Sequence, residues 1–561
     1  MKTRWYKDAV VYQIYPKSFC DSNGDGIGDI QGIISKLDYI KSLGVDAVWI
    51  SPMYKSPQKD NGYDVSDYRD IDPMYGTLAD FKQLVHELKK RDIKLIMDLV
   101  VNHTSSEHKW FVNSKSCVTS KYRDYYIWRK GKNNDGKTPP NNWTSRFSGS
   151  AWKYDETTNE WYLHLFTEEQ PDLNWNNPRV REEVVNICKY WLKLGVDGFR
   201  CDVITYVAKD QKFKNGKAHL ALVGDEYFVM APPWHLYMKQ LSNKIWNKYD
   251  TLIVAEGAGA NYRNVYEATS EISNEFDSFI TFEHLEVDYK YSFLPVKFNL
   301  PKFKRILRKW QQMPRECWPT LYLENHDQPR STSRYIKDEK YAKEGAKMLC
   351  VCMQFQRGTP YIYQGQELGM TNCHFEWEEY RDGFVPMLEK TIKKIFPPLM
   401  PIAKKVLQNK ARDNARTPMQ WTDGKYAGFS THEPWIKVND NKNTINVRAE
   451  ENDPNSVLNF YRQILEIRKN NEVIQNGAYI EYQKENNDLF IYERRYESKS
   501  FLVVCNFKPK NVKFRVPRAL YFENSAKVIS NYQDSPVLLN DCTLRPYEAI
   551  VYCLDDAKEI F

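Results

Sequence analysis

The chain has 561 residues, of which 42% are hydrophobic, 14% aromatic and 27% charged. This composition excludes a disordered or collagen-like chain, and the length predicts one large domain with one or two smaller ones. The net charge of +7 arises from interleaved basic and acidic residues, a pattern that does not favour binding to nucleic acid.

The start of the chain and its cysteines indicate a cellular compartment. The segment MKTRWYKDAVVYQIYPKSF has neither the apolar core nor the cleavage site of a secretory signal peptide. No run of about 18 apolar residues is found, so no membrane span is expected. Eleven cysteines without regular spacing are typical of reduced thiols. We therefore expect a cytoplasmic protein with neither a membrane nor a nucleic acid as partner.

Short runs rich in Val and Ile alternate with longer amphipathic stretches over most of the chain. Continuous apolarity is typical of parallel strands that are covered by helices on both faces. The pattern predicts an α/β fold, a (β/α)8 TIM barrel, with a doubly wound open sheet as the structural alternative. The eight predicted strands are 10–15, 45–50, 94–101, 198–203, 251–256, 279–282, 320–324 and 359–363.

Two regions interrupt this alternation. After the third strand, residues 105–173 are rich in Trp, Tyr, Asn, Gly and Ser, which predicts an inserted loop-rich subdomain B that shapes the substrate site. Residues 479–561 contain short alternating runs and predict a C-terminal antiparallel β-sandwich domain. Residues 1–104 and 174–478 would then form the two parts of the catalytic barrel.

Polar side chains stand at the ends of several predicted strands, where a barrel enzyme places its functional residues. A carboxylate at the end of an apolar strand costs free energy, so four such ends indicate chemistry rather than structure. Paired carboxylates in an aromatic-rich cleft suit glycoside hydrolysis, and no phosphate loop, thiol nucleophile or zinc motif competes. The residues are Asp98, Asn102, His103, Arg200, Asp202, Glu256, His326 and Asp327.

At these positions the sequence resembles the α-amylase superfamily of glycoside hydrolases (family 13), in its oligo-1,6-glucosidase and α-glucosidase branch. The resemblance covers essentially the whole chain, and its motifs occur in order at spacings that a barrel allows. They are VVYQIYPKSF, DNGYDVSDY, DLVVNHT, QPDLN, GFRCDVI, IVAEG, ENHDQPR, GTPYIYQGQELGM and RDNARTPMQW.

The resemblance implies a retaining mechanism. Asp202 would be the nucleophile that forms a covalent glucosyl-enzyme, and Glu256 the general acid and then the base. Asp327 would bind sugar hydroxyls and help to distort the ring. Arg200 lies two residues before Asp202 on one strand, so both face the same side, and its guanidinium would favour the ionised carboxylate.

The same resemblance implies a pocket that binds the terminal sugar of a small oligosaccharide. Asp60, Tyr63 and Arg416 match positions that hold the non-reducing glucose, with Tyr63 stacked beneath the ring, which favours exo action. His103 and His326 would donate hydrogen bonds to glucose hydroxyls. Two residues of the inserted subdomain, Phe147 and Phe166, would form pocket walls. A role in the core of the subdomain is an equal alternative for both.

The segment DSNGDGIGD, residues 21–29, is a candidate for a structural Ca2+ site remote from the chemistry. Oxygen ligands at alternate positions suit a hard cation, but the loop is not an EF-hand because its twelfth position is Gly32. The alternative is an Asx-rich turn that binds no metal. No cofactor is expected for catalysis. The resemblance implies as metal ligands Asp21, Asn23, Asp25, Ile27 and Asp29.

One residue bears on linkage. Val203, directly after Asp202, matches members that prefer α-1,6 bonds, because a methyl group there removes a potential hydrogen bond. Alternatives are an α-1,4-glucosidase, a sucrose-active relative or a phosphotrehalase. Pro171 and Glu286 depart from the phosphotrehalase pattern, and a Glu would repel phosphate. Gly257, residues 231–235 and Gln366 depart from the family pattern in general, which leaves the second sugar open.

A different class of function is a catalytically inactive binding or scaffold protein, because transporter heavy chains reuse this fold without catalysis. Those chains carry a membrane segment and lose catalytic carboxylates. This sequence has no such segment and keeps Asp202, Glu256 and Asp327, so the site favours an enzyme.

Overall fold

The computed structural model describes residues 4–134, 136–147, 149–218, 222–290 and 294–555. Its contacts divide the chain into two compact units, described separately here. Unit 1 is built mainly from Trp49–Phe282, and unit 2 from Trp5–Val48, Glu283–Pro314 and Trp318–Phe561.

Four buried parallel strands form the centre of unit 1. They pair in the order β11-β10-β9-β5, where β5 is Lys94–Val100, β9 Gly198–Asp202, β10 Leu252–Glu256 and β11 Ser278–Ile280. In this register Arg200 lies opposite both Asp98 on β5 and Val254 on β10. Because parallel strands end at one edge of a sheet, the register gathers the polar residues at their carboxyl ends.

The helices between these strands have clear start and stop signals. In α3 (Leu78–Lys90), Thr77 and Asp80 form a capping box, and the buried residues recur with helical spacing. In α5 (Pro178–Leu194), Asn177 caps the start, and Gly195 ends the helix at φ 104°, a left-handed angle that favours glycine. The other helices of unit 1 are α4 Lys109–Ser116, α6 Trp234–Lys244 and α7 Tyr262–Thr269.

The inserted segment between β5 and α5 contains a small antiparallel sheet in the order β6-β8-β7. These strands are β6 Trp128–Arg129, β7 Trp152–Asp155 and β8 Glu160–Leu163. Their apolar core is completed by side chains that follow β9, between Val203 and Phe228. The amide of Asn142 accepts from Gly216 N and donates to Gly216 O, which fixes the two segments together. The sequence did not predict this contribution from outside 105–173.

Unit 2 contains three further parallel strands in the order β1-β15-β14. They are β1 Val11–Ile14, β15 Thr359–Tyr363 and β14 Thr320–Leu321. The strand predicted to reach Glu324 ends at Leu321, because the next residues bind side chains instead: Tyr322 O accepts from the His284 ring and Glu324 pairs with Arg330.

The eight parallel strands follow a barrel order. Around the sheet the order is β11-β10-β9-β5-β2-β1-β15-β14, with β2 at Ala47–Ile50, so sequence neighbours are sheet neighbours. A doubly wound sheet would instead reverse its strand order at a switch point. The fold is therefore a (β/α)8 barrel with an insertion after the third strand, as predicted.

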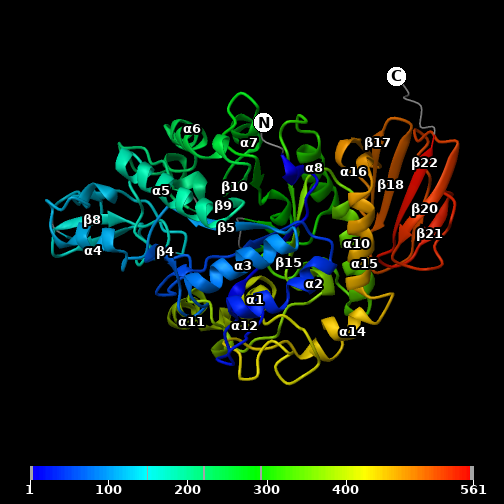
Figure 1. The fold of residues 1–561 in the computed structure, drawn as a ribbon, viewed down its shortest axis with the longest axis horizontal. Coiled ribbons are helices and arrows are strands. Elements are labelled where there is room, and N and C mark those ends of the chain that lie inside the picture. Colours follow the sequence, from blue (N-terminus) through cyan, green and yellow to red (C-terminus); the bar gives the residue numbers. More distant parts are fainter. Residues whose placement is uncertain (1–3, 135, 148, 219–221, 291–293, 556–561) are drawn as a thin grey trace. The chain divides into compact units, whose positions relative to one another are not determined.

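The last part of unit 2 is an antiparallel sheet of five strands in the order β16-β17-β18-β22-β20 (Figure 1). Helix α10 (Ala342–Gln354) packs against β18 and β22 and also against α15 (Val457–Lys469). The sheet strands are β16 Ala478–Tyr482, β17 Leu489–Tyr496, β18 Lys499–Asn506, β20 Asn524–Ser530 and β22 Ala549–Asp555, beside a pair of β19 Val512–Phe514 and β21 Cys542–Leu544.

Several shorter elements complete the described chain. The remaining helices are α1 Ile30–Ser35, α2 Leu37–Ser42, α8 Leu300–Gln311, α9 Ser331–Tyr335, α11 Phe384–Ile395, α12 Met400–Lys410, α13 Asp413–Arg416, α14 Val447–Glu451 and α16 Glu472–Asn476. The remaining strands form two pairs, β3 Tyr54–Lys55 with β4 Asp67–Ile71, and β12 Tyr289–Lys290 with β13 Leu294–Pro295.

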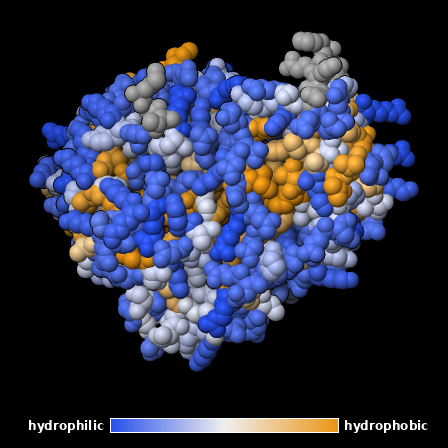
Figure 2. Space-filling view, turned by 45° about the vertical axis from the view of Figure 1, so that its right-hand side comes forward, coloured by the Kyte–Doolittle hydropathy of each residue, from blue (hydrophilic) through white to orange (hydrophobic). Residues whose placement is uncertain are grey.

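Within the described ranges, no helix has the length and apolarity needed to cross a membrane. On the face drawn in Figure 2, hydrophobic side chains form separate patches between hydrophilic ones. None of the eleven cysteines forms a disulfide in the structure; eight are buried, Cys542 and Cys553 are partly exposed, and Cys117 is exposed.

Candidate active site

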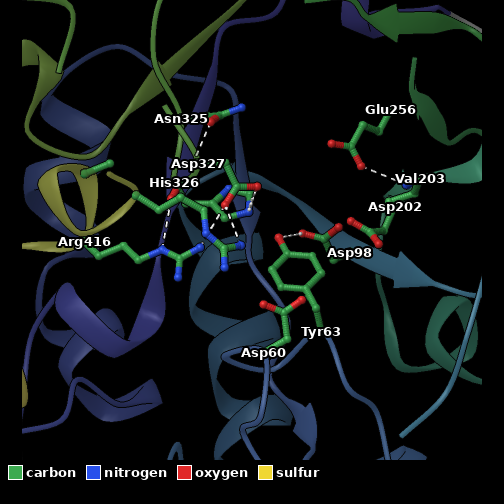
Figure 3. Close-up of polar contacts among 12 residues, drawn as sticks. Asp60, Tyr63, Asp98, Asp202, Val203, Glu256, Asn325, His326, Asp327 and Arg416 are labelled. Carbon is green, nitrogen blue, oxygen red and sulfur yellow. Dashed lines mark hydrogen bonds and ion pairs between the residues drawn. The ribbon is translucent and has the colours of Figure 1, made fainter. Parts of the chain in front are cut away.

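In unit 1, three acidic side chains surround the buried guanidinium of Arg200. Figure 3 shows these three acids, Asp98, Asp202 and Glu256. Arg200 and Asp202 point to the same side of β9 because they are two residues apart. Nη1 of Arg200 lies 2.5 Å from Asp98 Oδ1 and 2.6 Å from Asp202 Oδ1, and Nη2 lies 2.9 Å from Glu256 Oε2. The ends of β5, β9 and β10 thus meet at a single cation.

The charges of this Arg200 cluster do not balance, since one guanidinium faces three carboxyl groups. Burial raises the pKa of Asp202, Glu256 and Asp98 raise it further, and Arg200 opposes them, with a net direction well above the usual range. The expected effect of Arg200 on Asp202 is present, but burial outweighs it. The cluster therefore favours the protonated form of Asp202 more than an exposed site would.

Val203 has an unusual backbone conformation next to the nucleophile position. Its φ of 41° and ψ of 32° lie in the left-handed region, where a β-branched residue is strained. In this conformation its N–H donates to Glu256 Oε2 at 2.8 Å. The strained residue therefore positions the carboxyl group that is predicted to act as acid.

The buried carboxylate of Asp64 fixes the loop that bears Asp60 and Tyr63. Asp64 accepts from the backbone N–H groups of Lys59 and Asp60, each at 2.9 Å, and from Ser56 Oγ at 3.0 Å. Burial raises the pKa of Asp64 to about 6. The loop also contains left-handed backbone at Gln58, Asn61 and Gly62, so Asp64 fixes a conformation that the chain alone would not favour.

The aromatic ring of this loop reaches the acidic cluster. The hydroxyl of Tyr63 donates to Asp98 Oδ2 at 3.3 Å, and the Arg200 guanidinium lies 5.9 Å from the ring centre. Trp49 Nε1 also donates to Asp98 Oδ2, at 2.9 Å. Asp98 is therefore a supporting group for Tyr63 and Arg200, a role that its strand-end position suggests but does not specify.

Gln170 joins the pocket loop to the third strand. Its Nε2 lies 3.1 Å from Asp60 Oδ2, 3.0 Å from His103 Nε2 and 3.4 Å from the carbonyl oxygen of Tyr63. His103 Nε2 also lies 3.0 Å from that carbonyl, while its Nδ1 faces the Asn102 amide at 3.2 Å. Burial lowers the pKa of His103 to about 4, so the ring is neutral at pH 7.

A buried lysine supports the same strand end from the segment after β9. Lys209 Nζ lies 2.7 Å from Asp172 Oδ2 and donates to Asn102 Oδ1 at 2.8 Å. Burial lowers the pKa of Lys209. The ammonium group thus ties the subdomain residue Asp172 to the barrel, a role that sequence reasoning missed.

Phe147 and Phe166, predicted as pocket walls or subdomain core, adjoin a pocket residue. The ring of Phe166 lies 5.1 Å from that of His103 and 6.0 Å from that of Phe147. Both side chains are partly exposed, while the fully buried aromatic core of the subdomain lies around Trp143 and Trp152. Phe166 also packs against that core, so its placement suits both alternatives.

In unit 2 the charge balance is reversed, because one carboxylate faces three nitrogen groups. Asp327 Oδ1 lies 2.8 Å from Arg416 Nη2 and 3.5 Å from Arg412 Nη1, and Oδ2 lies 3.2 Å from His326 Nε2. Burial alone would raise the pKa of Asp327, but His326, Arg412 and Arg416 hold it well below the usual range. The surroundings of Asp327 therefore favour its ionised form.

Two arginines and their partners fix this Asp327 cluster. Arg416 Nε donates to the carbonyl oxygen of His326 at 3.1 Å, and its buried Nη1 has no hydrogen-bond partner. Arg412 makes two bonds to Asp382, at 2.6 and 2.9 Å. Arg412 and Asp382 were not among the predicted site residues, because Asp382 lies in a divergent segment.

The predicted metal loop is closed by its own hydrogen bonds. Asp21 accepts from the backbone of Asn23, Gly24 and Gly26 and from Ser430 Oγ. Asp29 accepts from Ser22 and Gly32. No group of three or more His, Cys, Asp or Glu side chains that suits a metal ion is found in the described part of the chain. The donor set fits an Asx-rich turn, and calcium stays a prediction.

The predicted residues therefore fall into two sets. Unit 1 holds Asp60, Tyr63, His103, Phe147, Phe166, Arg200, Asp202, Val203 and Glu256, and unit 2 holds His326, Asp327 and Arg416. The sequence signal for the missed Gln170 and Asp172 was the segment QPDLN, whereas a lysine in an apolar stretch was the only trace of Lys209.

Comparison with known domains decides the family. Residues 13–477 match the alpha amylase catalytic domain, and residues 479–544 match the alpha amylase C-terminal all-beta domain. The chain belongs to the alpha-amylase family. It is a glycoside hydrolase by this membership, as its carboxylate arrangement requires.

Full-length relatives place this alpha-amylase family protein in the predicted branch. The oligo-1,6-glucosidase of Parageobacillus thermoglucosidasius is 46% identical over 98% of this chain and 99% of its own. The trehalose-6-phosphate hydrolase of Bacillus subtilis (strain 168) is 43% identical over 99% of each chain. The crystal structure of trehalose-6-phosphate hydrolase from Bacillus licheniformis is 42% identical with a TM-score of 0.93, covering 98% of this chain and 100% of that one.

Proposed function

We propose that the protein is a retaining, exo-acting α-glucosidase that releases glucose from the non-reducing end of short α-1,6-linked oligosaccharides. One observation carries the proposal. The two terminal nitrogens of Arg200 bind Asp202 and Glu256, so one guanidinium keeps the two carboxyl groups close together. Retaining glycosidases need carboxyl groups about 5–5.5 Å apart, whereas inverting enzymes leave room for a water between them.

The proposed reaction has two displacements. Asp202 attacks the anomeric carbon while Glu256 gives its proton to the glycosidic oxygen, so that bond breaks as the glucosyl ester forms. Glu256, now ionised, takes a proton from a water molecule whose oxygen attacks the same carbon and releases Asp202. The chemistry uses no cofactor.

The remaining pocket residues would bind the terminal glucose. Asp327 is ionised and accepts hydrogen bonds from hydroxyl groups, and Arg416 offers the unpartnered Nη1 as a donor. Tyr63 is buried and presents its ring beside Arg200. The charged groups of Asp327 and Arg416 would bind hydroxyl groups of the terminal glucose. Such a site suits one terminal sugar better than the middle of a long chain, which supports exo action.

The preference for α-1,6 bonds is the most specific part of the proposal. It is supported by Val203, whose side chain belongs to an apolar cluster with Tyr206, Phe213 and Phe228 and offers no hydrogen bond to the leaving sugar. It is also supported by the names of the relatives that are similar over the full length.

The second candidate substrate is trehalose 6-phosphate, because relatives of similar identity carry that name. Glu286 opposes it, since this exposed carboxylate would repel a phosphate group. Maltose and sucrose are further alternatives through the divergent residues 231–235 and Gly257.

Substrate comparison tests the specificity, and product stereochemistry tests the mechanism. The ratio kcat/KM is measured on isomaltose, maltose, sucrose, trehalose and trehalose 6-phosphate, and isomaltose should lead by about 10–200-fold. Proton NMR of the first product should show α-glucose. A lead for maltose contradicts the Val203 argument, a lead for trehalose 6-phosphate contradicts the branch, and β-glucose contradicts retention.

We also propose that the enzyme acts in the cytoplasm on small oligosaccharides. The support is that none of the eleven cysteines forms a disulfide in the structure, which suits a reducing compartment. Fractionation of the source cells with activity assays of each fraction tests this location.

A further inference from the structure

Gln13 is a buried polar residue inside an otherwise apolar strand. It lies in β1, and its side chain is 1% exposed. Its backbone carbonyl accepts from Gln364 N, and the residue pairs with Tyr363 of β15. A buried amide in a parallel strand costs free energy unless it is hydrogen-bonded, so its partner identifies its role.

That partner is the ring of His326. The amide nitrogen of Gln13 lies 2.8 Å from His326 Nδ1, and both side chains are buried. An amide nitrogen only donates, so the ring nitrogen that faces it must be a bare acceptor. The Gln13 contact therefore specifies that Nδ1 carries no proton.

The other ring nitrogen leads to the same assignment independently. His326 Nε2 lies 3.2 Å from Asp327 Oδ2, and the guanidinium groups of Arg412 and Arg416 beside Asp327 Oδ1 favour the ionised carboxylate, whose oxygens only accept. Nε2 must therefore carry the proton. Tyr15 stacks on the imidazole with centres 6.1 Å apart and planes 11° apart, so the ring cannot easily turn over to exchange its nitrogens.

We propose that Gln13 is a positioning residue that holds His326 as the neutral tautomer with its proton on Nε2. In this state Nε2 can donate to Asp327 or to a sugar hydroxyl without adding a charge to the Asp327 cluster. A carboxylate in place of the amide would accept from Nδ1–H and stabilise the imidazolium instead. One amide group thus sets both the donor position and the charge of the histidine.

The first test reads the ring directly and does not depend on the function proposed above. Nitrogen NMR of protein containing 15N-histidine distinguishes bare from protonated ring nitrogens, and His326→Asn identifies the His326 signals by their loss. The wild type should show bare Nδ1 and protonated Nε2 at pH 7. Gln13→Glu should protonate both nitrogens, and Gln13→Met should remove the single fixed tautomer.

A matched control separates positioning from packing. Gln356 is another fully buried glutamine of unit 2, and its Nε2 donates to the carbonyl oxygen of Cys352 at 2.9 Å. Gln356→Met should destabilise the fold as much as Gln13→Met does and leave the His326 signals unchanged. A wild-type ring with its proton on Nδ1, or a ring unaffected by Gln13→Glu, overturns the proposal.

The second test measures the consequence for catalysis and rests on the proposed function. Gln13→Met should lower kcat/KM on an aryl α-glucoside about fivefold, the usual value of one hydrogen bond. In a His326→Asn background the same change should have no further effect, because Gln13 acts only through the ring. A fivefold loss in both backgrounds overturns the proposal. If the wild type does not hydrolyse α-glucosides, the proposed function fails while the NMR result still stands.

Discussion

The Arg200 cluster of unit 1 and the Asp327 cluster of unit 2 are opposite solutions to the burial of charge. In the first, one guanidinium faces three carboxyl groups; in the second, one carboxylate faces two guanidinium groups and an imidazole. The pKa of Asp202 is accordingly raised and that of Asp327 lowered. The first arrangement favours the protonated form of a carboxyl group, and the second favours the ionised form.

The largest expected effect distinguishes the proton transfer assigned to Glu256 from the charge assigned to Asp327. Glu256→Gln should lower kcat on isomaltose by about 10²–10⁴-fold, because general acid–base catalysis is lost. For an aryl glucoside whose phenol leaves without protonation, Glu256→Gln should slow the first step, the formation of the glucosyl-enzyme, much less. Asp327→Asn should instead impair both substrates to the same degree. Steady-state and burst kinetics on the two substrates check this, and an equal loss in Glu256→Gln would assign the proton elsewhere.

The next effect concerns the two guanidinium groups that hold Asp327. Arg416→Met should lower kcat/KM by about 10–100-fold, because it removes a buried guanidinium that bonds to a partly exposed carboxylate, and a hydrogen bond to a charged group contributes about 1.5–3 kcal/mol. Arg412→Met should cost less than about tenfold, since its contact is longer, at 3.5 Å, and its side chain is partly exposed.

The same two variants predict a pH effect of fixed sign. Each removes a cation that lowers the pKa of Asp327, so that pKa rises and the acid limb of kcat/KM moves to higher pH. The shift should be larger for Arg416→Met. An unmoved acid limb in Arg416→Met contradicts the assignment of Asp327 as an ionised binding group.

Asp64 sharpens the comparison because it is a buried carboxyl group bound by neutral donors from the backbone and a serine. Its pKa of about 6 lies above the unfolded value of 3.8. The folded state thus binds the proton more tightly, a contribution that is full below pH 3.8 and lost as pH rises through about 6. Relative to Asp64→Asn, the wild type should gain up to about 3 kcal/mol between pH 7 and pH 4.

Urea unfolding of both proteins across that pH range measures the difference. A parallel measurement of KM links it to function, because the loop bearing Asp60 and Tyr63 is held by Asp64. A stability difference that does not change with pH would contradict the raised pKa.

The smallest effect concerns the loop of residues 21–29, which has acidic groups but binds its own backbone. If calcium occupies the loop as the sequence predicts, EDTA lowers the Tm and added calcium restores it, because an ion that binds only the folded state stabilises it. Asp25→Asn should abolish that response without changing kcat. A Tm that is the same with EDTA and with calcium favours the metal-free turn that the hydrogen bonds describe.

The sequence was sufficient to predict the barrel and the strand-end residues, because both follow from local patterns. Buried parallel strands have continuous apolar runs, and a polar residue directly after such a run has few positions open to it. Arg200 and Asp202 could be placed on one face from their spacing alone.

Contacts between distant segments could not be predicted in this way. The bond from Lys209 to Asn102 joins residues 107 positions apart, and the bonds from Arg412 to Asp382 join a known motif to a divergent one. The left-handed backbone of Val203 is likewise invisible in the sequence, because its local preference is for extended structure and the surrounding fold overrides it.

The shared core of the inserted subdomain has a consequence for the order of synthesis. Its aromatic side chains, such as Trp143 and Trp152, pack against residues between Val203 and Phe228 that follow β9. The ribosome synthesises these partners after the subdomain itself, with a delay on the order of 3–10 s at typical elongation rates. The insertion therefore waits with exposed aromatic surface until the strand bearing Asp202 has emerged. The indole rings of Trp143 and Trp152 should therefore be more accessible to a solvent quencher in a nascent chain stalled before residue 203 than in one stalled well after residue 228.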